Sequence, residues 1–497
     1  MASAATLRLA ARANEERPRL VTHDRQGRRI DTVEFDPAWH ALLGRAVADG
    51  LVALPWEERR PGAQVARAAL FYLHAQAEAG TQCPLAMSYG AVPVLQKLSE
   101  THPEIDALWL PKLLSRRYDP RLAPAAAKDG VLFGMGMTER QGGSDVRSNV
   151  TVAEPQGGAR YRLRGHKWFF SAPMCDAFLV LAQAPGGLSC FLLPQFREDG
   201  TRNSLRLQRL KDKLGNRSNA SSEVEFHGAD ALLLGEEGRG VPTIIEMATY
   251  TRLDCVLATA GMQRRAVAVA LNHARQRHAF GKPLIEQPLM RNVLADLALE
   301  AEACTRLALY LASCYEATAD ERDRLIGRLL TPAAKFHVCK RGPQFAAEAL
   351  EVLGGNGYVE EQDLARIYRE LPLLSIWEGA GNVMCLDVKR TLAREPAAAE
   401  ALLDRLEEAR GASRCLDEQR DRLAEALRAP DDADARRLAH AITLAVQAAL
   451  LLDAAPEGPA REFCRSRLGD KRWGASYGTL ASLRNADEIL ARAMPGA

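Results

Sequence analysis

Residues 135–145 read MGMTERQGGSD, a glycine-rich turn at which the spacing of apolar residues along the sequence changes. Before the turn, residues 1–133 carry apolar residues at helical spacing, as in the segment GAQVARAALFYLHAQAEAG. After it, residues 134–237 contain short runs such as YRLRGHKWFFS and SSEVEFHGA, which are rich in apolar residues and divided by Gly, Pro, Asn and Asp. The turn therefore separates an N-terminal helical domain from a central antiparallel β domain.

A helical period returns at residue 238 and persists to the C-terminus. We expect a helical bundle over residues 238–390 and an additional helical domain over residues 391–497. The helices expected in the bundle cover residues 241–278, 288–316, 322–352 and 376–394. An order of helices, strands and then helices again predicts an α+β multidomain chain.

The overall composition favours an ordinary folded protein and excludes some classes of partner. The chain has 497 residues, of which 47% are hydrophobic and 26% charged, and its net charge is +2. This balance provides no strong field for nucleic acid or an acidic membrane. Arginines interrupt the N-terminal segment, so we expect no signal peptide, and we find no apolar stretch that would predict a membrane span. We therefore expect a cytoplasmic protein.

The ten cysteines are too widely separated for a CxxC redox pair or for a close-paired zinc signature. Free cysteines in a reducing compartment are commonly buried. We therefore expect buried structural thiols and no metal site.

Two segments of the β region carry groups that suit an anionic or flat ligand. In MGMTERQGGSD, Thr138, Gly143 and Ser144 supply hydroxyl and backbone donors in a loop that can approach an anion or a ring closely. In GHKWFFS, residues 165–171, aromatic side chains stand beside a serine hydroxyl. Each feature by itself is more often structural, since aromatic residues in strands usually belong to the core.

Two segments of the helical region add a cation and an acid. Arg277, within RQRHAFGKPL, is an always-charged donor suited to a diphosphate, and the turn in LGGNGY exposes backbone N–H groups. Glu378, within SIWEGAGN, follows Trp377 and precedes a glycine. A carboxylate beside apolar surface suits a general base, although a single acid at such a position is more often a helix cap on the surface.

The order and spacing of these motifs resemble the acyl-CoA dehydrogenase family across residues 40–390. The segments MTERQGGSD, KDKLGNRSNAS, RQRHAFGKPL and SIWEGAGNVMCLDV resemble most closely its AidB-like branch, which is associated with the response to alkylation damage. The resemblance implies the acyl-CoA dehydrogenase fold, with a four-helix bundle following the β domain. It also implies one FAD per subunit and a homotetramer built as a dimer of dimers.

The resemblance also implies which residues bind FAD. Arg277 and the turn at residues 354–357 are expected to reach the FAD of a neighbouring subunit. The full set of expected flavin contacts is Met135, Thr138, Gly143, Ser144, Phe169, Phe170, Ser171, Arg277, Gly354, Gly355, Gly357, Trp377, Gly379 and Asn382.

Glu378 matches the family's catalytic base, which removes the α-proton of an acyl thioester while the β-hydride passes to flavin N5. In the family, the backbone N–H of the base residue and a ribityl hydroxyl of the flavin donate hydrogen bonds to the thioester carbonyl. These bonds stabilise the charge that develops as an enolate. Some relatives place the base just before an arginine earlier in the bundle, but here Thr251 precedes Arg252, so either Glu378 is the base or the chain has none.

Several positions depart from the family pattern. Phe169 stands where the family has Trp, Glu351 stands where it has Gln, and Asn382 stands where many dehydrogenases have Gln. The AidB-like branch shares these departures. They predict weak or unusual acyl-CoA specificity.

Two functions remain open on the sequence alone. One is an FAD-dependent acyl-CoA dehydrogenase, with an acyl-CoA oxidase as a lesser variant. The other is a DNA-binding protective flavoprotein with little or no turnover, because AidB-like proteins are proposed to bind double-stranded DNA through the C-terminal helical domain. The segment REFCRSRLGDKR gives a basic stripe that suits phosphate contacts, although such a stripe is more often a solvated face: Arg461, Arg465, Arg467, Lys471 and Arg472.

Overall fold

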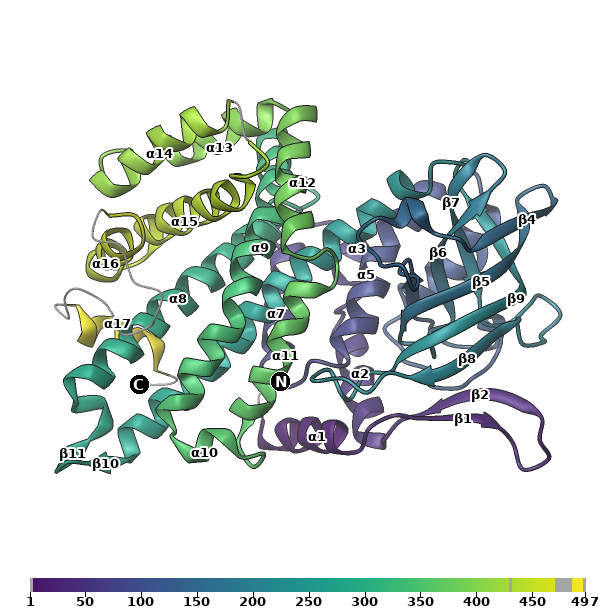
Figure 1. The fold of residues 1–497 in the computed structure, drawn as a ribbon, viewed down its shortest axis with the longest axis horizontal. Helices are drawn as coiled ribbons and strands as arrows, with labels where there is room; N and C mark the ends of the chain where they lie inside the picture. The colour runs from purple at the N-terminus through teal and green to yellow at the C-terminus, as the bar shows by residue number, and fades with distance from the viewer. Residues whose placement is uncertain (1–2, 429–430, 470–484, 495–497) are drawn as a thin grey trace. The chain divides into compact units, whose positions relative to one another are not determined.

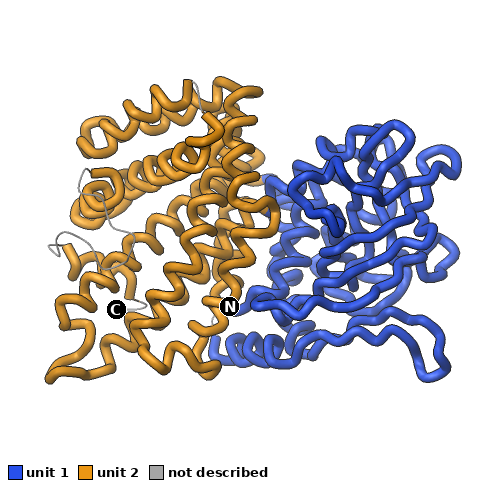
Figure 2. The backbone as a smooth tube through the Cα atoms, in the orientation of Figure 1, with its two compact units in different colours: residues 1–59, 77–251 blue, residues 60–76, 252–497 orange. Residues whose placement is uncertain are grey.

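A computed structural model describes residues 3–428, 431–469 and 485–494, which form two compact units (Figures 1 and 2). Unit 1 comprises residues 1–59 and 77–251, and unit 2 comprises residues 60–76 and 252–497. The boundary falls within the long helix α7 (Gly240–Gln276). The additional C-terminal helices belong to the same compact unit as the bundle.

Unit 1 begins with helices and one exposed β-hairpin. At the start of α2, the side chain of Asp36 accepts a hydrogen bond of 2.8 Å from the N–H of Ala38, and Pro37 occupies the first turn, where a missing N–H has little cost. The elements outside the β domain are α1 (Ala4–Glu15), β1 (Arg19–His23), β2 (Arg29–Glu34), α2 (Pro37–Ala48), α3 (Leu54–Glu57), α5 (Gln82–Leu98) and α6 (Leu110–Leu113).

The β domain of unit 1 is a seven-stranded sheet with the order β3-β6-β4-β5-β9-β7, and β8 pairs with β9. A further pairing between β6 and β7 joins two strands that stand apart in this order, so the sheet closes on itself. Most pairings are antiparallel, as expected, but β3 and β4 run parallel to β6. The strands are β3 (Phe133–Gly136), β4 (Val152–Gly157), β5 (Arg160–Ser171), β6 (Ala177–Ala184), β7 (Gly187–Pro194), β8 (Leu205–Leu210) and β9 (Ser221–Leu234).

Unit 2 is helical apart from one very short hairpin. Figure 1 shows α14 and α15 side by side, and they pack within the same unit as α8 and α9. The elements are α4 (Ala63–Ala75), most of α7, β10 (His278–Ala279), β11 (Lys282–Pro283), α8 (Pro288–Ser313), α9 (Glu321–Val352), α10 (Gly355–Tyr358), α11 (Asp363–Ile376), α12 (Gly381–Arg394), α13 (Ala397–Glu407), α14 (Arg414–Ala426), α15 (Ala435–Ala454), α16 (Glu457–Arg467) and α17 (Ala486–Ala493).

The helix predicted over residues 376–394 begins too early. In the structure α11 ends at Ile376, residues 377–380 form a loop, and α12 begins only at Gly381. Proline was a poor guide here because Pro372 lies inside α11 without ending it. Tertiary packing can therefore override the usual preference of proline for helix ends.

A buried ion pair explains why residues 60–76 fold with unit 2. Arg67 on α4 is 1% exposed, Asp254 on α7 is 2% exposed, and Nη2 of Arg67 donates to Oδ2 of Asp254 at 2.9 Å. Burial raises the pKa of Asp254, although the guanidinium opposes this shift. Because removing one member of a buried pair leaves an uncompensated charge, the two helices depend on each other.

One helix among the described residues, α15, is long and apolar enough to span a membrane, a feature that the sequence analysis missed. However, 61% of its apolar window is buried against the rest of the protein. The core helix of a folded domain has the same character. All ten cysteines are free and all except Cys415 are buried, which confirms the expectation of buried thiols.

The basic stripe predicted for DNA is interrupted by burial. Arg467, at the end of α16, is 6% exposed and forms an ion pair with Asp296 on α8, and it lies 3.8 Å from Glu300. The prediction that Arg467 contacts DNA is wrong, because its guanidinium balances carboxylates inside the bundle.

The other members of the stripe are either paired or not described. Arg461 is exposed and pairs with Glu457, and Arg465 is half-exposed and pairs with Glu462. Both pairs lie along one helix, where such contacts stabilise the helix itself. Lys471 and Arg472 lie outside the described residues.

We expect the substitution Arg467→Met to lower the free energy of unfolding of unit 2 by about 3–5 kcal/mol, because it removes one member of a buried ion pair. The matched change Arg461→Met, on the exposed side of the same helix, should cost less than about 0.5 kcal/mol. Urea unfolding followed by far-ultraviolet circular dichroism measures both. Equal unfolding midpoints for the two variants would contradict this account.

Candidate functional site

The loop after β3 is held by a buried ion pair in unit 1. Lys167 and Glu139 are both 0% exposed, and Nζ of Lys167 donates to Oε1 of Glu139 and to the carbonyl of Leu181, each at 2.7 Å. Burial lowers the pKa of Lys167 to about 8, and Glu139 opposes this shift. Glu139 also accepts hydrogen bonds from the N–H groups of Val150 and Thr151. Both oxygens of its carboxylate are therefore hydrogen-bonded to the segments that fix the loop.

This pair brings two of the predicted segments side by side. The N–H of Trp168 donates to the carbonyl of Thr138 at 2.9 Å, which joins the end of β5 to the loop after β3. A Cβ atom on Gly143 would lie 2.4 Å from Oγ1 of Thr138, so only glycine lets this part of the loop close over the threonine. Met135 is half-buried and Ser144 is exposed.

The end of β5 presents Phe169 but not Phe170. Phe169 is 50% exposed, whereas Phe170 is 0% exposed and its ring centroid lies 4.3 Å from that of Phe178. The prediction that Phe170 covers a flavin is wrong, because successive side chains on a strand point to opposite faces. Ser171 is half-buried, with its hydroxyl 3.5 Å from that of Ser221.

A cation that the sequence analysis did not single out lies over the exposed aromatic surface. Nζ of Lys211 is 3.4 Å from the ring centroid of Trp168 and 4.7 Å from that of Phe169. Both distances fall within the range of cation–π attraction. The segment KDKLGNRSNAS begins with this lysine, whose backbone N–H donates to the carbonyl of Ser221 on β9. Because β9 pairs with β5, the sheet brings the lysine beside Trp168, which the sequence alone does not show.

In unit 2, Arg277 lies at the base of the β10–β11 hairpin and is exposed. The two-residue turn of the hairpin is Phe280-Gly281, with φ angles of +51° and +81°. Left-handed angles at both positions are typical of a tight hairpin turn, but a bulky residue at the first position is unusual. The ring of Phe280 is 96% exposed.

The glycine turn after α9 exposes only part of its backbone. Gly354 has a φ of +59°, and neither Gly354 nor Gly355 has an atom within 4 Å of the place where a Cβ would stand. Gly357 differs, because it is buried and a Cβ there would lie 2.1 Å from the carbonyl oxygen of Leu350. The predicted contact between Gly357 and a ligand therefore does not fit the structure, because Gly357 is buried against α9.

Glu378 lies in the loop between α11 and α12. It is half-buried and has a φ of +58°, a left-handed conformation that costs a non-glycine residue about 1–2 kcal/mol. Gly379 follows with a φ of +106°, and Trp377 precedes with its indole N–H buried and without a hydrogen-bond partner among the described residues. Asn382 is exposed in the first turn of α12.

A buried lysine on α9 donates hydrogen bonds to two carbonyls of this loop. Lys335, on α9, is 1% exposed, and its Nζ donates to the carbonyls of Trp377 at 2.8 Å and of Gly379 at 2.6 Å. These two carbonyls flank the peptide group of Glu378. The sequence analysis missed Lys335, because nothing in the helical segment TPAAKFHV distinguishes it from any other lysine.

Arg252 holds the carbonyl between these two, that of Glu378 itself. Its Nε donates to the carbonyl of Glu378 at 3.0 Å, and its Nη1 donates to Oδ2 of Asp387 at 2.7 Å. Burial raises the pKa of the Cys255 thiol; Lys335 opposes that shift and Glu378 adds to it. The buried ammonium and the carboxylate of the loop therefore act on the same thiol.

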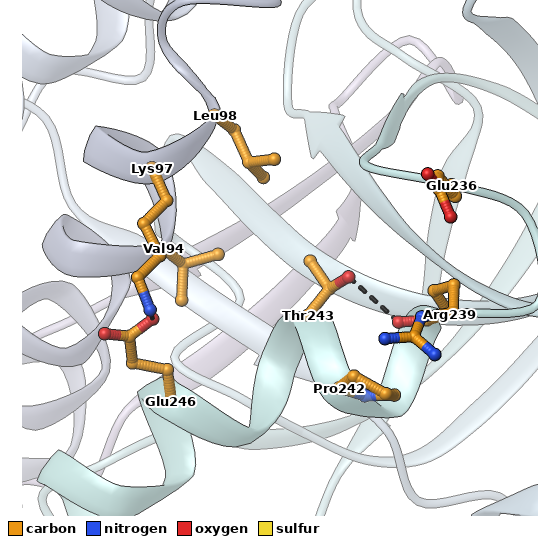
Figure 3. A pocket seen from close by; sticks show the side chains of 8 residues that line it. All are labelled: Val94, Lys97, Leu98, Glu236, Arg239, Pro242, Thr243 and Glu246. Atoms are coloured by element: carbon orange, nitrogen blue, oxygen red, sulfur yellow. Dashed lines mark hydrogen bonds and ion pairs between the residues drawn. The ribbon is translucent and has the colours of Figure 1, made fainter.

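A separate cavity of about 330 Å³ lies in unit 1 between the end of α5 and the start of α7 (Figure 3). Lys97 and Glu246 form an ion pair of 2.6 Å at its edge, and the hydroxyl of Thr243 donates to the carbonyl of Arg239. None of the residues predicted to bind FAD or to act as base lines it. The lining residues are Val94, Lys97, Leu98, Glu236, Arg239, Pro242, Thr243 and Glu246.

Three family models match the chain. Residues 1–120 match the N-terminal domain of the adaptive response protein AidB, residues 134–229 match the acyl-CoA dehydrogenase middle domain, and residues 238–393 match the acyl-CoA dehydrogenase C-terminal domain. The β middle domain and the helical C-terminal domain of this family agree with the predicted fold class.

The chain is also similar to individual proteins over most of its length. It is 49% identical to AidB of Escherichia coli (strain K12), over 100% of this chain and 90% of that protein. The structure described as the apo form of Bd2924 is 32% identical, with a TM-score of 0.82 and 90% of each chain covered. Caenorhabditis elegans ACDH-11 in complex with C11-CoA is 28% identical, with a TM-score of 0.85, 94% of this chain and 86% of that chain covered. This chain belongs to the acyl-CoA dehydrogenase family and, within it, to the AidB branch.

Proposed function

We propose that this protein is an FAD-dependent oxidoreductase that oxidises an acyl thioester, with Glu378 as the base. The observation that carries the proposal is the loop of Glu378, in which two buried cations, Lys335 and Arg252, hold the carbonyls of three successive residues. A surface capping acid needs no such support. The C11-CoA bound to the Caenorhabditis elegans relative supports an acyl-CoA as the substrate class.

The described residues fit a flavin in chemistry. The indole N–H of Trp377 is buried without a partner, which a polar ligand atom would satisfy. Phe169 offers a half-exposed aromatic face beside the cation of Lys211, and Gly354 and Gly355 leave their backbone open. The residues proposed to hold FAD are Met135, Thr138, Gly143, Ser144, Phe169, Ser171, Arg277, Gly354, Gly355, Trp377, Gly379 and Asn382.

When bound, FAD supplies the oxidant that accepts the β-hydrogen of the substrate with its two electrons. The protein supplies acid–base chemistry and orientation. The carboxylate of Glu378 takes the α-proton, and the backbone N–H of Glu378 donates a hydrogen bond to the thioester carbonyl. That donor stabilises the negative charge that develops on the carbonyl oxygen as the α-proton leaves.

We also propose that copies of this chain assemble as a homotetramer. Phe280 is 96% exposed at the tip of its hairpin, and Leu289, near the start of α8, is 84% exposed. An interface that covers these two side chains gains free energy from the apolar area it removes from water. In this proposal Arg277 and the turn at residues 354–357 reach the FAD of the neighbouring subunit, and the buried, free cysteines are consistent with assembly in the cytoplasm.

The alternative, a DNA-binding protective flavoprotein, draws less support from the described residues. Arg467 is buried in an ion pair, and the guanidinium groups of Arg461 and Arg465 are already paired with glutamates of their own helix. Binding DNA through these two arginines requires the exchange of those partners for phosphates. No observation on the described part of the tail favours that exchange, so the oxidoreductase is the function proposed here.

We expect the substitution Glu378→Gln to slow the anaerobic bleaching of oxidised flavin by acyl-CoA about 100-fold to 10,000-fold, because the amide cannot accept the α-proton. The yellow protein should still bind FAD. The measurement mixes a panel of acyl-CoAs with purified protein and follows flavin absorbance.

Glu400→Gln, an exposed change on α13, is the matched control and should bleach at the wild-type rate. Wild-type bleaching by Glu378→Gln would exclude Glu378 as the base. A wild-type protein that no member of the panel bleaches would favour the DNA-binding alternative.

We expect Phe280→Ser to weaken assembly and to lower the flavin content of the purified protein, because burying an aromatic ring at an interface contributes about 2 kcal/mol. Sedimentation velocity and the ratio of flavin to protein absorbance measure the two effects. Leu122→Ser, at a residue that is 42% exposed in unit 1, serves as the control. An unchanged tetramer with full flavin content would refute the proposed role of the hairpin.

A further inference from the structure

Lys335 is a buried cation whose partners are backbone carbonyls. Its side chain is 1% exposed, and its ammonium binds the carbonyls of Trp377 and Gly379, with no ion pair to a carboxylate among the described residues. The three buried cations Arg67, Lys167 and Arg467, described above, each have a carboxylate partner. Burying a charge is costly, and carbonyl oxygens compensate less than a carboxylate does.

The carbonyl of Trp377 belongs to the peptide group that precedes Glu378, and the carbonyl of Gly379 belongs to the peptide group between Gly379 and Ala380. The peptide bond between Trp377 and Glu378 is trans. In a trans peptide the C=O and N–H groups point in opposite directions, so fixing the carbonyl of Trp377 also fixes the direction of the N–H of Glu378. Lys335 therefore determines where that N–H points without touching it.

The second bond limits the loop on its other side. Glu378 and Gly379 both have positive φ angles, of +58° and +106°. Such a conformation persists at a non-glycine residue only when its surroundings over-determine it. By holding Trp377 and Gly379 together, one ammonium keeps Glu378 in this conformation, with its side chain and its N–H in fixed directions.

We propose that Lys335 is a positioning residue for the chemistry of Glu378, an inference that rests on the function proposed above. Through the carbonyls of Trp377 and Gly379 it directs the backbone N–H of Glu378 to the thioester carbonyl and the carboxylate to the α-proton. Lys335 itself touches neither the substrate nor the flavin. It works through the loop alone.

The test compares Lys335→Met, which keeps the length of the side chain but removes its charge and donors, with Lys340→Met, an exposed position on the same helix. We expect Lys335→Met to lower kcat about 100-fold with KM within about twofold of wild type, because misplacement of a reacting group by about 1 Å costs about that much. Lys340→Met should leave both constants unchanged.

A second readout does not depend on turnover. In hydrogen–deuterium exchange, the amides of residues 377–382 should exchange faster in Lys335→Met than in wild type, with and without FAD, while the rest of α9 keeps its protection. Lys335→Gln, which retains a neutral donor, should give an intermediate result in both measurements. A variant pair that loses the fold altogether would overturn the proposal, because a residue that acts on the loop alone leaves the bundle intact.

The outcomes separate this inference from the proposed function. If Glu378→Gln abolishes bleaching while Lys335→Met keeps wild-type kcat or wild-type exchange at residues 377–382, the positioning role is refuted and the base remains. If Glu378→Gln bleaches normally, the proposed function itself fails, whatever Lys335→Met does.

Discussion

The hydrogen bonds from one buried ammonium to two backbone carbonyls are the interaction on which the proposed chemistry depends. They hold a loop in which Glu378 takes a left-handed conformation that costs a non-glycine residue about 1–2 kcal/mol. Arg252 adds a third bond to the same loop from α7. Because α7, α9 and the loop are far apart in sequence, the geometry of the base depends on the assembled bundle and not on the local sequence.

In unit 1, a buried lysine likewise fixes a loop that belongs to the predicted flavin segments. The Lys167–Glu139 pair lies beneath the loop after β3, and the backbone bond from Trp168 to Thr138 fastens that loop to β5. Buried charges of this kind are weak sources of net stability, because desolvation offsets most of their attraction. Their effect here is to define which segments lie together, so that the loop has one arrangement.

The fold class was predictable because it rests on local periodicity. Short apolar runs divided by turn residues predicted the β domain, and long helical periods predicted what precedes and follows it. The expected motifs also fell together where neighbouring strands carry them, as with Thr138, Gly143 and Phe169. The failures came where burial decides. Phe170 turned inward by the alternation of its strand, Arg467 turned inward to meet Asp296, and Pro372 lay inside a helix that packing maintains.

The sequence by itself determined the order of helices and strands, the family to which they belong, and Glu378 as the candidate base. The order of elements follows from the periodicity of apolar residues, and the family and the candidate base follow from the resemblance of the motifs along the chain. Only the tertiary structure decided that Lys335 and Arg252 hold the loop of Glu378, and that the side chain of Phe169 is exposed while that of Phe170 is buried. Burial and hydrogen bonding between distant segments arise from packing. The residue type of a lysine does not show whether its side chain is buried in a helix bundle or exposed to water.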